Sequence, residues 1–256
     1  AADNGKFPDG TSRMASRDLS DIVQTQIIED LRQVYNPGWT RRGLWDRPYH
    51  EARRPNVPAM LLELLSHQNL ADQKYGLDPE FRFNVSRSVY KGILKYLAYT
   101  ENRDYIVQSL PVKNLAIVPL KGKTFRLSWK PSVDENEPTS LPDRYMVYKR
   151  TGESGFDNGT MTDKTEFEFE IDSCNTIYSF KVTAVNDGGE SFDSEVLSAG
   201  INGKNANNIL IVNGFDRISG PSYFDNGNMA GISWWDDRGV ADHYDFINIG
   251  DHVLDH

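Results

Sequence analysis

Apolar residues recur at the helical period in two stretches near the start of the chain. The first stretch runs from Ser16 to Val34, and its apolar positions are Leu19, Ile22, Val23, Ile27 and Leu31. This spacing predicts an amphipathic helix with Ser16 as its N-cap and Asn36-Pro37-Gly38 as its end. A second helix is predicted from Asp78-Pro79 onward, because Asp suits the N-cap and Pro the first helical position. Its apolar positions are Phe81, Val85, Val89, Ile93, Leu94 and Leu97.

Between these two helices lies a short apolar run that contains a single carboxylate. Residues Val57 to Leu62 are mostly apolar, Glu63 follows, and the polar group Ser66 to Asn69 comes soon after. A run this short, entered through a proline, predicts a buried strand. A buried carboxylate is costly unless it is paired, so Glu63 is either an acid/base group or half of an ion pair, for example with Arg53. Helix, loop, strand and helix predict part of an α/β layer over residues 1–105.

The pattern changes to a two-residue period between residues 110 and 201. Short alternating runs are separated by turn clusters: Phe125–Trp129, Arg144–Tyr148, Glu166–Phe169 and Tyr178–Val185. This pattern predicts a small antiparallel β-sandwich whose aromatic residues pack in the core. The spacing of Trp129, Tyr145 and Tyr178 resembles that of a fibronectin type III module.

Residues 205–256 form a third segment. Asn208 to Asp216 reads as a buried strand that ends at a glycine turn, which predicts the start of a further α/β domain. The rest of the segment is polar and contains His243, His252 and His256. A metal cluster can be drawn from these histidines and their aspartate neighbours, but we favour a polar loop. The chain is thus predicted to be multidomain, with part of an α/β domain, a sandwich and the start of another α/β domain.

Composition and charge narrow the classes of function. The net charge of −9 argues against nucleic acid or an anionic membrane as a partner, and no basic stripe typical of nucleic-acid binding is visible. The single cysteine, Cys174, excludes an internal disulfide and a cysteine-based zinc site. No run approaches the roughly 18 apolar residues of a membrane span. The chain begins at Ala1 instead of Met and ends without a cap, so a piece of a longer protein is expected.

Five short motifs in the first segment form one recognisable set. They are Arg42-Gly43, the strand Val57–Glu63 with the form Pro-Ala-x-Leu-x-Glu, the pair Asn69 and Asp72, Leu77–Arg82, and Gly92–Leu97. As a set they resemble the C-terminal half of the zinc-dependent N-acetylmuramoyl-L-alanine amidases, which cut the amide between the peptidoglycan sugar and its stem peptide. The resemblance implies that Glu63 is the catalytic carboxylate, which would accept a proton from a metal-polarised water.

The resemblance also implies what this chain lacks. The family's zinc ligands, a His in a Gly-rich loop, a Glu and a second His, lie upstream of the matched half. Zinc is therefore expected in the intact protein, with no metal ligand in this chain. Leu65 and Ser66 stand where the family usually has Gly and an aromatic residue. Arg53, His67 and Asn69 are the candidate substrate-binding residues, and the 256-residue chain alone is expected to be inactive.

Two classes of function remain open. The order of the segments resembles large secreted proteins of Bacteroides-type bacteria, some of which are named xanthan lyases. The first hypothesis is part of a secreted or periplasmic cell-wall amidase that acts on peptidoglycan. The second is a polysaccharide-processing protein or a non-catalytic carbohydrate-binding or structural module of the cell surface. An arginine-rich loop could separate them: in the enzyme hypothesis part of it lines a groove for a carboxylate-rich peptide, and otherwise it is a solvated surface loop. Its arginines are Arg41, Arg42, Arg47, Arg53 and Arg54.

Overall fold

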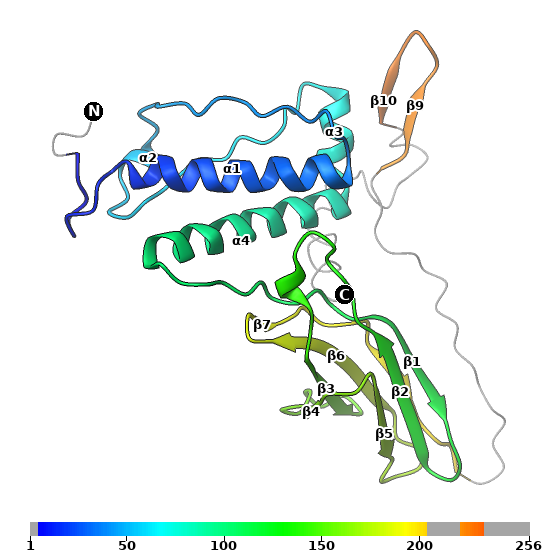
Figure 1. Cartoon of the computed structure of the whole chain (residues 1–256). Coiled ribbons are helices and arrows are strands. Elements are labelled where there is room, and N and C mark those ends of the chain that lie inside the picture. The colour runs from blue at the N-terminus through cyan, green and yellow to red at the C-terminus, as the bar shows by residue number, and fades with distance from the viewer. Residues whose placement is uncertain (1–4, 204–220, 233–256) are drawn as a thin grey trace. The chain divides into compact units, whose positions relative to one another are not determined.

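The computed structural model describes residues 5–203 and 221–232 of the chain. The described residues divide into two compact units, the first made of residues 5–105 and 221–232 and the second of residues 106–203 (Figure 1). A short hairpin of β9 (Tyr223–Asp225) and β10 (Ala230–Ile232) is also described. The predicted strand at 208–216 and the three histidines of the last segment lie outside the described residues. Within the described residues, none of the helices is both long and apolar enough to cross a membrane.

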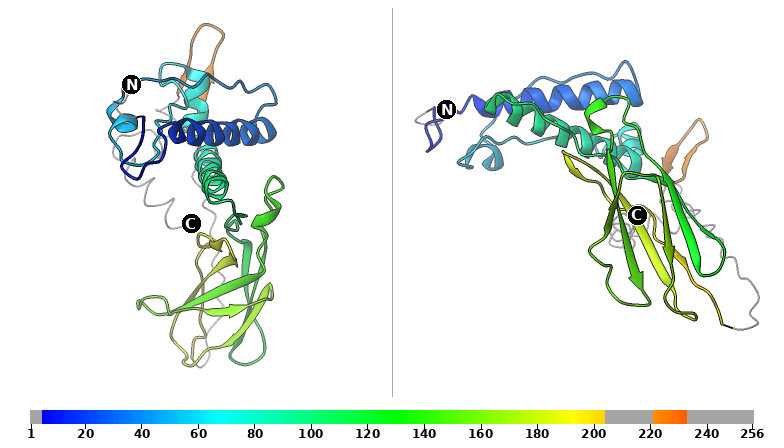
Figure 2. Two further views of the ribbon diagram at one scale, coloured as in Figure 1. Left: turned by 60° about the vertical axis from the view of Figure 1, so that its left-hand side comes forward. Right: turned by 60° about the horizontal axis from the view of Figure 1, so that its bottom comes forward.

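The first unit is built from helices. They are α1 (Ala15–Val34), α2 (His50–Arg53), α3 (Leu70–Gly76) and α4 (Pro79–Glu101). Both long helices were predicted, and α1 and α4 pack side by side (Figures 1 and 2). Their contact is close at Gly92, where a Cβ atom would lie 2.7 Å from the Cα of Val23. The predicted apolar stripes meet in one core, whose buried members are Leu19, Val23, Ile27, Leu31, Phe81, Val85 and Tyr96.

One predicted helix cap is confirmed and the other is wrong. The Asp78 side chain accepts a hydrogen bond from the Glu80 amide at 3.0 Å, and Pro79 opens α4. By contrast α1 begins one residue before Ser16, and its N-cap position is Met14, which has no side-chain cap. The Ser16 hydroxyl is used elsewhere, because it accepts a hydrogen bond from the Ala59 amide at 3.3 Å.

A buried polar cluster joins α1 to α4. Asp30 on α1 accepts hydrogen bonds from Ser88 Oγ at 2.6 Å and from Gln26 Nε2 at 3.0 Å, and its Oδ2 lies 2.8 Å from Lys91 Nζ. The Lys91 side chain is only 3% exposed. Asp30 can meet Ser88 and Lys91 of the other helix only in one relative position of the helices. The cluster therefore fixes the register of α1 against α4.

The predicted buried strand at Val57–Glu63 is not formed, and this expectation is wrong. The segment is neither helix nor strand, and Glu63 is exposed. Leu61 and Leu62 are 44% and 41% exposed, although Met60 and Leu65 pack against the helical core. A strand needs a neighbouring strand for its backbone groups, and the strands described in the first unit, β9 and β10, pair with each other and not with this segment. The predicted α/β layer is therefore absent from this part, which is helical.

The second unit is the predicted antiparallel sandwich. One sheet has the order β1-β2-β5, with bounds Lys113–Pro119, Thr124–Lys130 and Glu166–Glu170. The other has the order β4-β3-β6-β7, with β8 also paired to β6; these strands are β3 (Arg144–Thr151), β4 (Thr160–Thr162), β6 (Tyr178–Asn186), β7 (Gly189–Glu190) and β8 (Leu197–Ala199). A 3₁₀ turn, η1 (Pro138–Ser140), precedes β3.

The core of the sandwich contains the aromatic residues that the pattern placed there. Trp129 from β2 packs edge-on against Tyr145 from β3, with ring centroids 5.4 Å apart. Phe180 from β6 lies at the centre of the other sheet and contacts Phe169 from β5 at 4.0 Å between centroids. β2 and the first half of β3 alternate buried and less buried positions, as strands with one face on the core require. The aromatic residues are core residues, as predicted.

The start of the second unit is anchored to the turn between β6 and β7. Val107 is fully buried, and its amide donates to Thr139 Oγ1 at 3.1 Å. The Asn186 side chain donates to the Val107 carbonyl at 2.9 Å. At Gly188 a Cβ atom would lie 2.6 Å from the Ile106 carbonyl oxygen, so the backbone approach requires glycine. Residues 106–108 are therefore part of the sandwich unit.

This anchoring predicts which of two sites between α4 and β1, Arg103 or Lys113, trypsin cleaves earlier. Trypsin is expected to cleave after Arg103, which is exposed just beyond the end of α4, before it cleaves after Lys113 on β1. Cleavage needs local unfolding, and the Asn186 and Thr139 contacts hold the chain from residue 106 onward. Mass spectrometry of early fragments measures the order. Early cleavage at Lys113 with Arg103 intact would contradict the anchoring.

Candidate functional site

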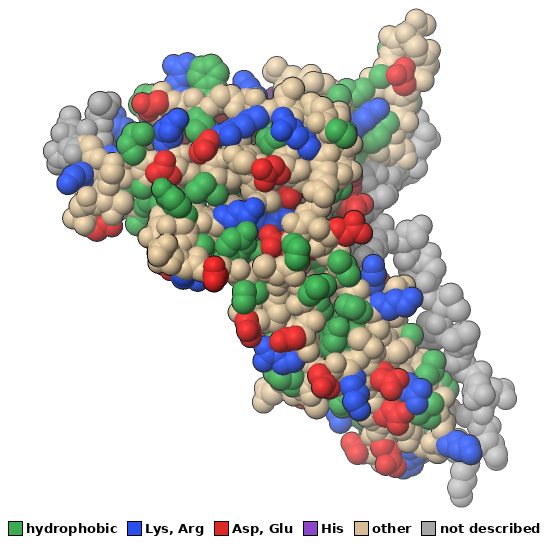
Figure 3. Space-filling view, viewed as in Figure 1, with side chains coloured by type: hydrophobic (Ala, Val, Ile, Leu, Met, Phe, Trp, Pro, Cys, Tyr) green, Lys and Arg blue, Asp and Glu red, His purple; other side chains and the backbone are tan. Residues whose placement is uncertain are grey.

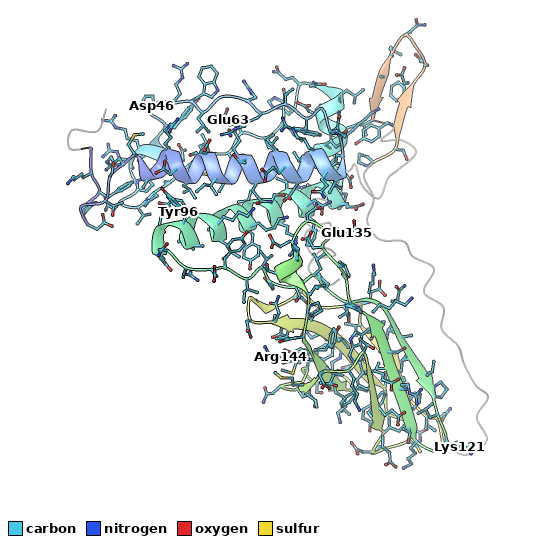
Figure 4. All side chains as sticks on the ribbon, in the orientation of Figure 1. Asp46, Glu63, Tyr96, Lys121, Glu135 and Arg144 are labelled. Carbon is cyan, nitrogen blue, oxygen red and sulfur yellow. The ribbon has the colours of Figure 1, made fainter. Side chains whose placement is uncertain are left out.

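Glu63, the predicted catalytic carboxylate, lies on the exposed segment between α2 and α3. In Figure 4 it lies above α1, whereas Tyr96 of α4 lies below that helix. Among the described residues the structure records no hydrogen bond or ion pair for its carboxylate, so the alternative ion pair with Arg53 is not formed. An exposed and unpartnered carboxylate has no environment that sets it apart from other surface glutamates.

The residues that follow Glu63 build a turn that leads into α3. Asn69 is the N-cap of α3, and its side chain accepts from the Ala71 amide at 3.0 Å. Asp72 accepts from the Ser66 amide at 2.9 Å, and the His67 carbonyl accepts from Gln73 Nε2. These contacts explain the Asn-x-x-Asp pattern by local structure. A role of His67 and Asn69 in substrate binding stays a prediction.

The arginine-rich loop has one member that is bound to the helical core. Arg41 donates to Gln24 Oε1 at 2.8 Å and to Thr25 Oγ1 at 2.9 Å, and it forms an ion pair with Asp21 on α1. The Gln24 side chain in turn donates to the Arg42 carbonyl at 3.0 Å. Arg41 therefore holds the loop along α1. Within the described part of the chain, the other arginines of the loop make no ion pair.

Large apolar side chains are exposed along the same stretch of chain. They are Leu44, Trp45, Tyr49, Val57, Leu61, Leu62 and Leu64. Figure 3 shows green hydrophobic and blue basic side chains intermixed over the helical unit. Exposed apolar residues gathered in one stretch are typical of a surface that binds a ligand or another part of a protein. The candidate site of the first unit is therefore the stretch 41–65, and sequence periodicity alone had placed part of it in a core.

The second unit carries a cluster on the outer face of its larger sheet. The Lys181 ammonium lies 4.8 Å from the Phe156 ring centroid and 5.2 Å from that of Tyr148, and it pairs with Asp193 at 2.6 Å. Partial burial, followed by a hydrogen bond to Glu190, raises the pKa of Tyr148 to about 12. The charges and hydrogen bonds of this cluster are satisfied internally, so it stiffens the sheet face and offers no open site.

No metal centre is present among the residues that the structure describes, because they contain no group of three His, Cys, Asp or Glu side chains close enough to share an ion. The zinc implied by the amidase resemblance is thus not matched by a donor set here. The histidines of the last segment lie outside the described residues. His50 and His67 are both exposed, and neither belongs to such a group among the described residues.

The geometry of the second unit defines a class of protein module, the two-sheet antiparallel sandwich with a Trp and Tyr core. The model of the Fibronectin type III domain matches residues 110–199. Residues 110–199 of this chain are therefore a fibronectin type III domain, as the aromatic spacing predicted. Such a domain is a structural or binding module. No curated protein matches the chain.

Solved structures similar to this chain include sandwich domains from several proteins. The twitchin kinase region from C. elegans is 22% identical and covers 40% of this chain and 18% of its own, with a TM-score of 0.34. The FN5 domain of Drosophila Lar is 20% identical and covers 37% of this chain and 98% of its own, with a TM-score of 0.29. FN3tt is 23% identical and covers 38% and 98%, with a TM-score of 0.32.

Proposed function

We propose that this chain is a connecting and binding part of a larger secreted or cell-surface protein. In this proposal the fibronectin type III domain acts as a spacer or binding module. The helical unit supplies one layer of a domain whose sheet comes from elsewhere in the protein. The observation that carries the proposal is the state of residues 57–65, which we call the unpaired segment.

The unpaired segment has the composition of a central strand without a sheet. Leu61 and Leu62 are consecutive and both are exposed. Successive side chains of an extended chain point to opposite sides, so Leu61 and Leu62 would place an apolar side chain on each face, while Met60 and Leu65 already pack against the helical core. Strands that are apolar on both faces occur in the middle of sheets whose two faces are both covered. The helices α1 and α4 would then cover one face.

The backbone of the segment supports the same reading. Within the described residues no backbone hydrogen bond is made by Met60 to Leu65, and the Ala59 amide bonds only to the Ser16 hydroxyl. Backbone groups in an apolar setting are nearly always paired. Strand addition would satisfy them and would remove the exposed leucines from water at the same time.

Amide hydrogen exchange tests this proposal. In the 256-residue chain the amides of 60–65 are expected to exchange at rates close to those of an unfolded peptide, while α4 is protected. In a longer natural protein that includes the upstream residues, the same amides are expected to slow by at least about 100-fold, which corresponds to roughly 2.7 kcal/mol of opening free energy. Equal exchange in both proteins would contradict strand completion.

A second candidate function is the zinc-dependent cell-wall amidase. The observation that favours it is the place of Glu63 near the end of the unpaired segment, since strand completion would enclose this carboxylate beside the new sheet. The described residues contain no group of side chains that could hold zinc, so zinc-dependent hydrolysis would require ligands from beyond the described residues. Peptidoglycan, or another polysaccharide in the case of a lyase-like protein, is then the partner.

A further inference from the structure

The stretch 41–54, which we call the basic segment, carries a local charge opposite to that of the whole chain. It holds five arginines against the two carboxylates Asp46 and Glu51, whereas the chain as a whole has a net charge of −9. Every one of these arginines is exposed. A local positive region attracts an anionic ligand to that region. The negative charge of the rest of the protein surface repels a long polyanion or an anionic membrane.

The guanidinium groups of the basic segment are available for a ligand, with one exception. Arg41 is engaged by α1. In the described part of the chain, no ion pair involves Arg42, Arg47, Arg53 or Arg54. An unpaired guanidinium presents a planar fork of donors, which matches a carboxylate in two parallel hydrogen bonds.

The same segment exposes two aromatic rings. Trp45 is 67% exposed and Tyr49 is 49% exposed. The Arg47 guanidinium carbon lies over the Trp45 ring, 5.3 Å from the ring centroid, so Arg47 already covers one face of the indole and a sugar ring would stack on the opposite face. An exposed indole beside an unpaired guanidinium offers a flat apolar face and a carboxylate-binding group to one ligand.

We propose that the basic segment binds a linear oligosaccharide that carries carboxylate groups, with Trp45 stacked on a sugar ring and Arg47 paired with a carboxylate. The C–H bonds on one face of a pyranose ring are weakly positive and pack against the electron-rich face of an indole. The proposal deepens the binding role proposed above by naming the ligand class. It does not depend on Glu63 or on strand completion.

The charges of the segment favour a sparse anion over a dense one. Asp46 and Glu51 alternate with the arginines, and each would repel a phosphate held at the neighbouring position. A nucleic acid carries a charge on every nucleotide, so it cannot avoid these carboxylates. An oligosaccharide with separated carboxylates can place its charges at the arginines alone.

Isothermal titration of the full chain tests the proposal, with a hyaluronan hexasaccharide, which carries a carboxylate on every second sugar, as the anionic probe and maltohexaose as the neutral one. The hyaluronan hexasaccharide is expected to bind, and maltohexaose at least 10-fold more weakly, an order-of-magnitude margin that corresponds to about 1.4 kcal/mol. Trp45→Ala and Arg47→Ala are each expected to weaken hyaluronan hexasaccharide binding by about 10-fold. Affinity is expected to fall as salt is raised.

Two variants of the second unit serve as controls. Phe192→Ala removes an aromatic ring that is 65% exposed, and Arg126→Ala removes an arginine already paired with Glu168. Both are expected to leave the affinity unchanged. Absence of hyaluronan hexasaccharide binding, unchanged binding by the Trp45 and Arg47 variants, or equal binding of a thymidine hexanucleotide would each overturn the proposal. The proposed strand completion is tested by hydrogen exchange at residues 60–65. The result of the titration therefore does not decide it.

Discussion

Asp30→Ala is expected to lower the free energy of unfolding of the helical unit by about 3–5 kcal/mol. The substitution removes the carboxylate that holds Lys91, whose side chain is 3% exposed, and it leaves the ammonium buried without a counter-charge. It also removes the acceptor for the Ser88 hydroxyl at 2.6 Å. Chemical denaturation followed by circular dichroism at the helical wavelength measures the change, because the second unit contributes mainly strands.

Matched variants separate the buried pair from exposed ones. Glu101→Ala removes the partner of Arg103 on the surface, where both side chains are 53% exposed, and an effect of no more than about 1 kcal/mol is expected. The double variant Asp30→Leu with Lys91→Met is expected to recover most of the stability lost in Asp30→Ala, because no charge is left unpaired. If Asp30→Ala costs no more than the Glu101 variant, the cluster does not hold α1 to α4.

Glu63→Gln is expected to reduce turnover by at least about 100-fold in an intact protein that has the amidase activity. Glutamine keeps the size of the side chain and cannot accept a proton, so only a general base would be lost. Because Glu63 is exposed in this chain and makes no contact within the described residues, the melting temperature of this chain is expected to stay unchanged. Turnover of muropeptides, zinc content and melting temperature are measured on the same samples.

The control for this experiment is Glu29→Gln, an exposed glutamate on α1 that lies in none of the motifs. It is expected to leave turnover and stability as they are. Full turnover of Glu63→Gln at normal zinc content would end the catalytic hypothesis and leave the connecting and binding role. A large drop in melting temperature of the intact protein would instead assign Glu63 to a structural pair formed on strand completion.

Residue spacing along the chain was enough to predict the helices and strands whose characteristic residues lie close together in the sequence. The apolar stripe of 16–34 and the Asp78-Pro79 start of α4 are confirmed, because a helix closes its hydrogen bonds within its own segment. The alternation in 125–129 and 178–185 identified strands of a sandwich that supplies their partners. The spacing of Trp129 and Tyr145 identified their place in a shared core.

Sequence reasoning failed where a residue's environment comes from distant parts of the chain. Val57–Glu63 has the composition of a buried strand, but burial needs a neighbouring strand, and none of the described strands pairs with this segment. Likewise Asp30 and Lys91 lie 61 residues apart and read as ordinary surface charges. The only sequence signal for them was their position next to the apolar stripes of their helices.

The sequence by itself therefore determined the two long helices, the fibronectin type III domain and many of their core residues, although Ile93 of the predicted stripe is exposed and the core residue Tyr96 was missed. Only the tertiary structure decided that Arg41 belongs to the scaffold, that Asp30 and Lys91 are buried together, and that Glu63 is exposed on an unpaired segment. The physical reason is that hydrogen-bond partners and solvent exposure depend on which segments meet in space, and spacing along the chain does not specify this.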